Sequence, residues 1–83
     1  MAAHARRQGV ATRAVRLMAH WAFEDLEVKR LELLTNLGNE ASEGVALKCG
    51  FQREGVLRSA RIIKGERVDL TLFALLPDEW SPP

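Results

Sequence analysis

The sequence predicts one α/β domain in which the elements follow the order helix, strand, helix, strand, strand. Three observations predict this class. Apolar residues recur at helical spacing in the first third of the chain. Charged and apolar residues then alternate near position 30, and two strand-like runs flank Lys64-Gly65. The 83 residues leave room for a single small domain, residues 1–83. We therefore expect a three-stranded mixed sheet with two helices and a small core.

A helix is expected over residues 9–26, after a short polar lead at residues 1–8. Its apolar residues follow i, i+3, i+4, i+7 spacing, which predicts one buried face. These residues are Ala14, Leu17, Met18, Trp21, Ala22 and Leu26. The opposite face carries Arg13, Arg16, His20 and Glu24.

The first strand is expected over residues 28–35, where Leu31 and Leu33 point to one side and Arg30 and Glu32 to the other. A turn at residues 36–38 follows. Asn39 is a favourable cap for a second helix that runs to about Cys49. Gly50 then suits the position just after a helix end, with Phe51 as the accompanying apolar contact.

The last two strands are expected over residues 52–63 and 67–76, joined by a turn at Lys64-Gly65. The second of them is apolar on both faces, which predicts a central position in the sheet. With only two helices and three strands, the domain can enclose only a small hydrophobic core.

The composition excludes several classes of protein. There are 12 basic and 11 acidic residues, so the net charge of +1 is too small for a general nucleic-acid binder. The basic residues bunch at Arg6, Arg7, Arg13 and Arg16, which indicates a local anion site. With one cysteine no internal disulfide forms, and no apolar run reaches the length of a membrane span. We expect a cytoplasmic protein without a metal site.

The stretch Arg6 to Thr12 is the strongest functional signal from the residues alone. Glycine permits close approach to the backbone, and unpaired amides at a helix start favour an anion such as a phosphate or pyrophosphate. Two plainer interpretations stay open: Gly9 serves turn geometry only, and Asn39 with Glu40 serves helix capping only.

Several short motifs stand in a fixed order. An Arg-x-x-Gly-x-Ala helix start is followed by Leu-Glu-Leu, Asn-x-Ala-Ser and Gly-Phe, and then by Arg53-Glu54-Gly55-Val56-Leu57-Arg58. The stretch from Gly65 to Asp69, Leu72 to Leu76 and Glu79-Trp80 completes the pattern. In this order the chain resembles the C-terminal half of a GNAT-superfamily N-acetyltransferase, in the branch of ribosomal-protein N-terminal acetyltransferases (RimJ/RimL-like). The resemblance covers residues 5–80 and implies a partial GNAT fold that lacks the N-terminal strands.

The resemblance implies that acetyl-CoA is the cosubstrate and assigns site residues. The loop that would cradle the pyrophosphate of coenzyme A comprises Arg6, Arg7, Gln8, Gly9, Val10, Ala11 and Thr12. Asn39 would contact the pantetheine arm or hold the second helix beside it, and the Ser42 hydroxyl would stabilise or protonate the leaving thiolate. Lys48 lies on the same helix within possible reach of the nucleotide phosphate, but we expect a solvated surface lysine. Many relatives carry a tyrosine acid where this chain has Ala46, and this chain has no tyrosine.

The implied reaction is transfer of acetyl to a primary amine, which includes a protein N-terminus, an amino acid, a polyamine or an antibiotic. Candidates for the base are Glu24, Glu32, Glu54 and Asp69. Glu54 is expected in a surface ion pair, and Asp69 is expected to be structural, paired with Arg58 or Arg61. Because the family's fourth strand is missing, we expect a bare edge on the 28–35 strand and a homodimer through that edge and the first helix. The alternative is a non-catalytic remnant that binds coenzyme A or serves as an interaction module.

Overall fold

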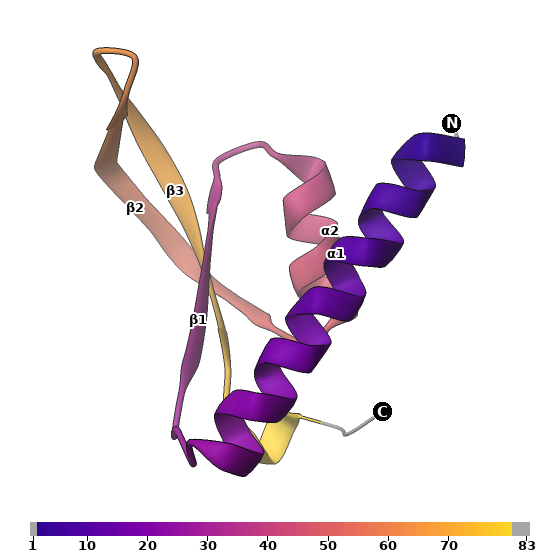
Figure 1. Cartoon of the computed structure of the whole chain (residues 1–83). Helices are drawn as coiled ribbons and strands as arrows, with labels where there is room; N and C mark the ends of the chain where they lie inside the picture. Colours follow the sequence, from indigo (N-terminus) through magenta and orange to yellow (C-terminus); the bar gives the residue numbers. More distant parts are fainter. Residues whose placement is uncertain (1, 81–83) are drawn as a thin grey trace.

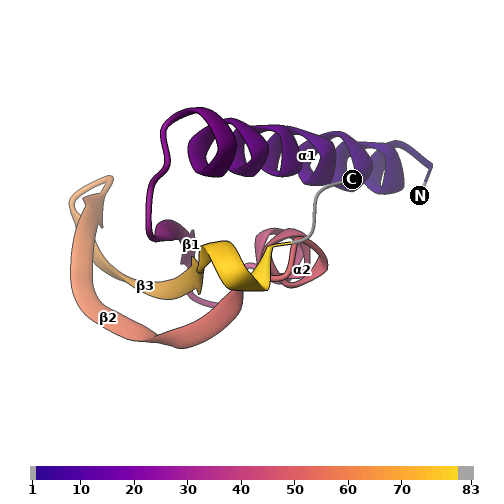
Figure 2. The ribbon, with the colours of Figure 1, turned by 90° about the horizontal axis from the view of Figure 1, so that it is seen from below.

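The computed structural model describes residues 2–80, and the side chains of residues 9–80. The elements are α1 (Ala2–His20), a π-helical segment η1 (Trp21–Asp25), β1 (Leu31–Asn36), α2 (Glu40–Lys48), β2 (Gln52–Ile63) and β3 (Glu66–Leu75), followed by a 3₁₀ turn (Pro77–Glu79). Both helices pack on one face of a twisted sheet, and the β2–β3 hairpin extends away from them (Figures 1 and 2). This arrangement confirms the predicted α/β class and element order.

The sheet has the order β1-β3-β2, so β3 is the central strand, as predicted from its apolar residues. Both pairings are antiparallel, with Leu33 opposite Phe73 and Arg53 opposite the same phenylalanine. The expectation of a mixed sheet is therefore wrong. β1 and β2 run in the same direction, but β3 lies between them and runs the opposite way, so no parallel pair forms.

The first helix begins at Ala2, seven residues before the predicted start. The segment before Gly9 is rich in alanine, arginine and glutamine, which are strong helix formers, and it contains no residue that would end a helix. Gly9 consequently lies in the helix interior. The first strand also differs from the prediction: β1 begins at Leu31, and residues 28–30 belong to the preceding loop.

The predicted apolar face of the first helix is largely solvent-exposed. Leu17 is 61% exposed and Trp21 53% exposed, and of the six predicted residues only Ala22 is buried. The side of α1 that packs inward carries Thr12, Val15 and Ala19, and α1 contacts α2 directly. The π-helical segment that follows also changes the angle between successive side chains, so a single helical period does not describe residues 9–26.

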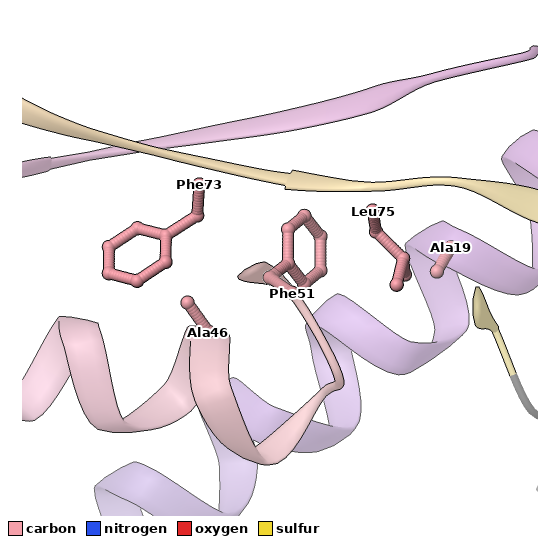
Figure 3. Close-up of a cluster of buried hydrophobic side chains, with 5 residues drawn as sticks. All are labelled: Ala19, Ala46, Phe51, Phe73 and Leu75. Carbon is pink, nitrogen blue, oxygen red and sulfur yellow. The ribbon is translucent and has the colours of Figure 1, made fainter. Parts of the chain in front are cut away.

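The core lies between the sheet and the two helices. Phe73 and Leu75 project from β3 toward Ala46 of α2 and Ala19 of α1, with Phe51 between them (Figure 3). All five side chains are at most 3% exposed. Trp80 closes this core at one end, with its ring 5.6 Å from that of Phe23.

The end of α2 is fixed as the sequence predicts. Gly50 adopts a φ of 89°, its amide donates to Leu47 O, and the amide of Phe51 donates to Ala46 O at 3.0 Å. This is the Schellman arrangement, which requires a left-handed residue and therefore favours glycine. It turns the chain so that the Phe51 side chain enters the core.

The hairpin turn at Lys64-Gly65 is also confirmed, since both residues have positive φ values of 52° and 79°. The role predicted for Asp69 needs a correction. Its Oδ1 accepts a hydrogen bond from the Ser59 amide at 2.8 Å instead of pairing with an arginine. Ser59 sits in an irregular part of β2 with a φ of 51°, and the carboxylate satisfies an amide that the strand ladder leaves free there. No helix in residues 2–80 is long and apolar enough to cross a membrane.

Candidate functional site

A cavity of about 480 Å³ lies between α1 and α2 on the helical side of the molecule. Its walls come from two turns of α1 and the last residue of α2. The lining residues are Gly9, Thr12, Arg13, Arg16, Leu17 and Lys48. Three of these six residues are cationic, and none is acidic. The cavity is therefore suited to an anion.

Arg16 ties the two helices together at this cavity. Its Nη2 donates to the backbone oxygen of Lys48 at 3.2 Å. The last carbonyls of a helix carry partial negative charge, so a guanidinium is favourable there. Because the side chain is held by this bond, its positive charge stays at the mouth of the cavity beside Arg13 and Lys48.

Thr12 lines the cavity and carries a buried hydroxyl. The residue is only 9% exposed, and its hydroxyl oxygen has no hydrogen-bond partner within the described part of the chain. A buried hydroxyl without a partner is costly, and such groups are usually satisfied by protein or by water. The Thr35 hydroxyl is in the same state among the described residues, and Thr35 does not line the cavity.

The residues predicted to bind the pyrophosphate are only partly gathered here. Gly9 and Thr12 line the cavity, whereas Val10 is 69% exposed and, like Ala11, does not line it. The side chains of Arg6, Arg7 and Gln8 lie outside the described residues. The structural premise of unpaired amides at a helix start is wrong for Gly9 to Thr12, because α1 begins at Ala2 and these residues lie within it.

The sequence analysis placed Arg13 and Arg16 in a local cluster of basic residues but did not assign them, or Lys48, to the coenzyme A site. Arg13 and Arg16 are three positions apart, which places them on the same side of a helix. The sequence shows that the two arginines are close together in the chain, but it does not show that they line one cavity with Lys48. Lys48 lies 32 residues from Arg16 in the chain, and the contact of its backbone with Arg16 depends on how α1 packs on α2.

Asn39 and Ser42 lie at the other end of α2. Asn39 caps the helix, as predicted, with its Oδ1 accepting from the Ser42 amide at 3.2 Å. The cap uses the backbone of Ser42 and leaves its half-buried hydroxyl uninvolved. Six residues separate Ser42 from Lys48, which is about 9 Å along a helix. The predicted thiolate partner is therefore well separated from the cationic cavity along α2.

None of the predicted bases lines the cationic cavity. Glu54 is in the expected ion pair, with Oε1 2.6 Å from Nη2 of Arg30, and Arg30 also contacts Glu32 at 2.8 Å. The hydrogen bond from Arg30 lowers the pKa of Glu54, which makes this carboxylate a weaker base. Cys49 is half-buried, and its burial raises the pKa of its thiol, as expected for a structural cysteine.

The fold and the cavity define a small α/β domain with a cavity lined by cationic side chains between its two helices. Comparison with known proteins makes this class more specific. Residues 1–52 match the family model described as "Acetyltransferase (GNAT) domain". The chain belongs to this family.

The relatives agree with the predicted branch. The chain is 37% identical over 74 residues to a Bacillus subtilis (strain 168) protein named "Putative ribosomal N-acetyltransferase YdaF", covering 89% of this chain and 40% of that protein. It is 30% identical over 71 residues to the ribosomal-protein-serine acetyltransferase of Escherichia coli (strain K12), covering 86% and 40%. The crystal structure of the ribosomal-protein-S5-alanine acetyltransferase from Vibrio fischeri superposes with a TM-score of 0.80 at 30% identity, covering 89% and 40%. The chain thus spans about two fifths of the length of these relatives.

Proposed function

We propose that this chain is the coenzyme A-binding part of an N-acetyltransferase that transfers acetyl from acetyl-CoA to a primary amine. The observation that carries the proposal is the cationic cavity between α1 and α2 in a chain of the GNAT family. Arg13, Arg16 and Lys48 supply positive charge for the phosphates.

Backbone amides at Gly9 can bind the pyrophosphate only if α1 begins later in the chain than Ala2. In the described helix the amides of residues 9–12 donate within α1, so they are not free for a ligand. We propose that binding of the pyrophosphate unwinds residues 2–8, which makes Gly9 the start of the helix and frees its first amides. The side-chain cations hold the phosphates before and after this change.

At the other end of α2, the cap residue Asn39 contacts the pantetheine arm, and the Ser42 hydroxyl lies beside the thioester sulfur. In the reaction the neutral amine nitrogen attacks the thioester carbonyl carbon, a C–N bond forms and the C–S bond breaks. The attacking nitrogen loses one proton, and the departing thiolate gains one. The Ser42 hydroxyl donates a hydrogen bond to the developing thiolate, while its backbone amide remains in the cap.

The setting proposed for this reaction is the cytoplasm, and the acceptor is a protein N-terminus or a small amine. The names of the relatives support a ribosomal protein as one acceptor. The second candidate function, a non-catalytic module that binds coenzyme A or a partner, is favoured by the short length relative to those proteins.

A homodimer is part of the proposal. Among residues 2–80 the only strand paired with β1 is β3, so the second edge of β1 carries no strand. Exposed edges and exposed apolar side chains such as Leu17 and Trp21 favour association. Sedimentation at micromolar concentration tests this point, and a compact monomer would contradict it.

Calorimetric titration with acetyl-CoA, coenzyme A and ATP tests the main proposal. Saturable binding of both CoA species, stronger than that of ATP, is expected. Arg16→Gln should weaken both, whereas Lys29→Gln, an exposed cation away from the cavity, should not. Absence of CoA binding would refute the cavity assignment. Acetyl transfer is then assayed with a peptide that has a free amino terminus, an amino acid, a polyamine and an amine-containing antibiotic. Binding of acetyl-CoA without transfer to any of these amines would favour the non-catalytic alternative.

A further inference from the structure

Three acidic side chains of the chain are half-buried, namely those of Glu43, Asp69 and Glu79. Two of them hold the backbone in place. Asp69 accepts a hydrogen bond from the Ser59 amide at 2.8 Å, and Glu79 accepts one from the Leu76 amide at 3.0 Å. Glu43 has neither a backbone donor nor an ion-pair partner within residues 9–80. It is therefore the one half-buried carboxylate whose position the fold does not explain.

A polar patch of the core lies beneath the first turn of α2. Thr71 of β3 is fully buried and shares a face of the strand with Phe73, which points toward α2 (Figure 3). Its hydroxyl oxygen lies 3.5 Å from Oε2 of Glu43, which is long for a hydrogen bond to a carboxylate. Thr35 of β1 lies directly opposite Thr71, and its buried hydroxyl has no partner within the described residues. The two hydroxyl groups make this part of the core polar, and the Glu43 carboxylate keeps most of its capacity to accept a proton.

Glu43 lies at the end of α2 where the sulfur of acetyl-CoA is proposed to bind. It follows Ser42 directly, so the Cα atoms of the two residues are about 3.8 Å apart. Its amide donates to the backbone oxygen of the cap residue Asn39 at 3.0 Å. During acetyl transfer the attacking nitrogen and the sulfur are bonded to the same carbon atom. A nitrogen that attacks a thioester beside Ser42 therefore comes close to the first turn of α2.

The other glutamates near the sheet and the helices are less suited to accept a proton there. Glu32 and Glu54 are both bound by Arg30, and such an ion pair makes a carboxylate a weaker base. Glu24 and Glu40 are exposed, so bulk water competes for their carboxylates. Burial and the lack of a strong partner thus single out the carboxylate beside the polar patch.

We propose that Glu43 is the base of acetyl transfer and that Thr71 positions its carboxylate. This inference rests on the proposed function, because it names a catalytic residue of the same reaction. As the C–N bond forms, the Glu43 carboxylate takes the proton that the attacking nitrogen loses. The C–S bond then breaks, and the protonated carboxyl group gives the same proton to the thiolate. The carboxylate is restored in this step, so no further reactant is needed.

Steady-state kinetics of the whole chain, with acetyl-CoA and a peptide that has a free amino terminus, test the base. Glu43→Gln keeps the size of the side chain but cannot take the proton. It should lower kcat by about 100- to 10,000-fold and leave the KM and the calorimetric affinity for acetyl-CoA unchanged. Glu40→Gln removes the same charge from the same helical turn and should match the parent. A parental kcat in Glu43→Gln, or an equal loss in both variants, would overturn the proposal.

Chemical rescue separates a missing base from a damaged fold. Glu43→Ala leaves space beside the polar patch for formate, a small carboxylate that can take the proton instead. Added formate should restore part of the kcat of Glu43→Ala and none of the kcat of Ser42→Ala. An equal response of the two variants to formate would contradict the role of base, and thermal melting shows that both are folded.

Two substitutions at Thr71 test its positioning role. Thr71→Ser keeps the hydroxyl and should retain the parental kcat, whereas Thr71→Val should lower kcat without changing the affinity for acetyl-CoA. Equal values of kcat in these two variants would exclude the hydroxyl from the reaction. If the parent transfers acetyl and Glu43→Gln transfers it equally fast, only this inference fails. If the parent transfers acetyl to no amine, the proposed reaction fails and this inference with it.

Discussion

Replacing Gly9 by alanine should raise stability and weaken coenzyme A binding at the same time. Gly9 lies within α1, and a Cβ built on it meets no heavy atom within 4 Å. Alanine is favoured over glycine inside a helix by about 0.8–1.0 kcal/mol. Unfolding of a chain of this size carries an entropy of roughly 0.17 kcal/mol/K, so the melting temperature should rise by about 5 °C.

The effect on binding has the opposite sign. Gly9 lines the cationic cavity, and the proposed complex needs both close approach to its backbone and unwinding of residues 2–8. Alanine opposes the unwinding by the same 0.8–1.0 kcal/mol, so the affinity for acetyl-CoA should fall at least about fourfold. Thermal melting and calorimetric titration measure the two effects.

Gly44→Ala is the matched control. Gly44 lies inside α2, a Cβ built on it also meets no heavy atom within 4 Å, and it does not line the cavity. This variant should gain similar stability and bind acetyl-CoA as the parent does. The reasoning is refuted if Gly9→Ala binds acetyl-CoA with unchanged affinity, or if both variants lose affinity equally.

Three further predictions address individual side chains. Ser42→Ala should slow acetyl transfer by about 10- to 1,000-fold in an activity assay without altering the melting temperature, because the cap uses only the Ser42 amide; equal rates would exclude the hydroxyl from the reaction. Asn39→Ala should lower stability by about 1 kcal/mol in denaturant unfolding, whereas Asn39→Asp should restore the cap but lack the amide donors for pantetheine; full acetyl-CoA affinity in the aspartate variant would argue against that contact. The pKa of Glu54 is lowered in the folded protein, so its contribution to stability is present above the ordinary value of 4.5 and is lost as the pH falls through the folded value. Thermal melting as a function of pH should show a smaller loss at acidic pH for Glu54→Gln, and identical pH profiles would contradict this sign.

Local signals predicted most of the strands and the second helix. The cap at Asn39 and the stop at Gly50 each depend on side chains or φ values within one turn, so the sequence sufficed to place α2. The turn at Lys64-Gly65 is equally local. The central position of β3 followed from apolar residues on both faces, because only a strand with neighbours on each side buries both.

The first helix shows where such reasoning fails. Its apolar pattern predicts Leu17 and Trp21 inside, yet the packed side of α1 carries Thr12, Val15 and Ala19. A helix with apolar residues on two sides leaves the choice of buried face to the elements on which it packs, here α2 and the core on the sheet. The start of α1 was misplaced because glycine weakens a helix by only about 1 kcal/mol, and the strong helix formers before Gly9 outweigh it.

The candidate site, like the fold, could be predicted from the sequence only in part. The sequence by itself determined the family and predicted an anion site around Gly9, because both inferences depend on residue types at fixed spacing along the chain. Only the tertiary structure decided that Arg13 and Arg16 share a cavity with Lys48, and that Glu43 of α2 lies beside Thr71 of β3. Those groupings bring together residues from different elements, and the packing of α1 on α2 and of α2 on the sheet sets their geometry.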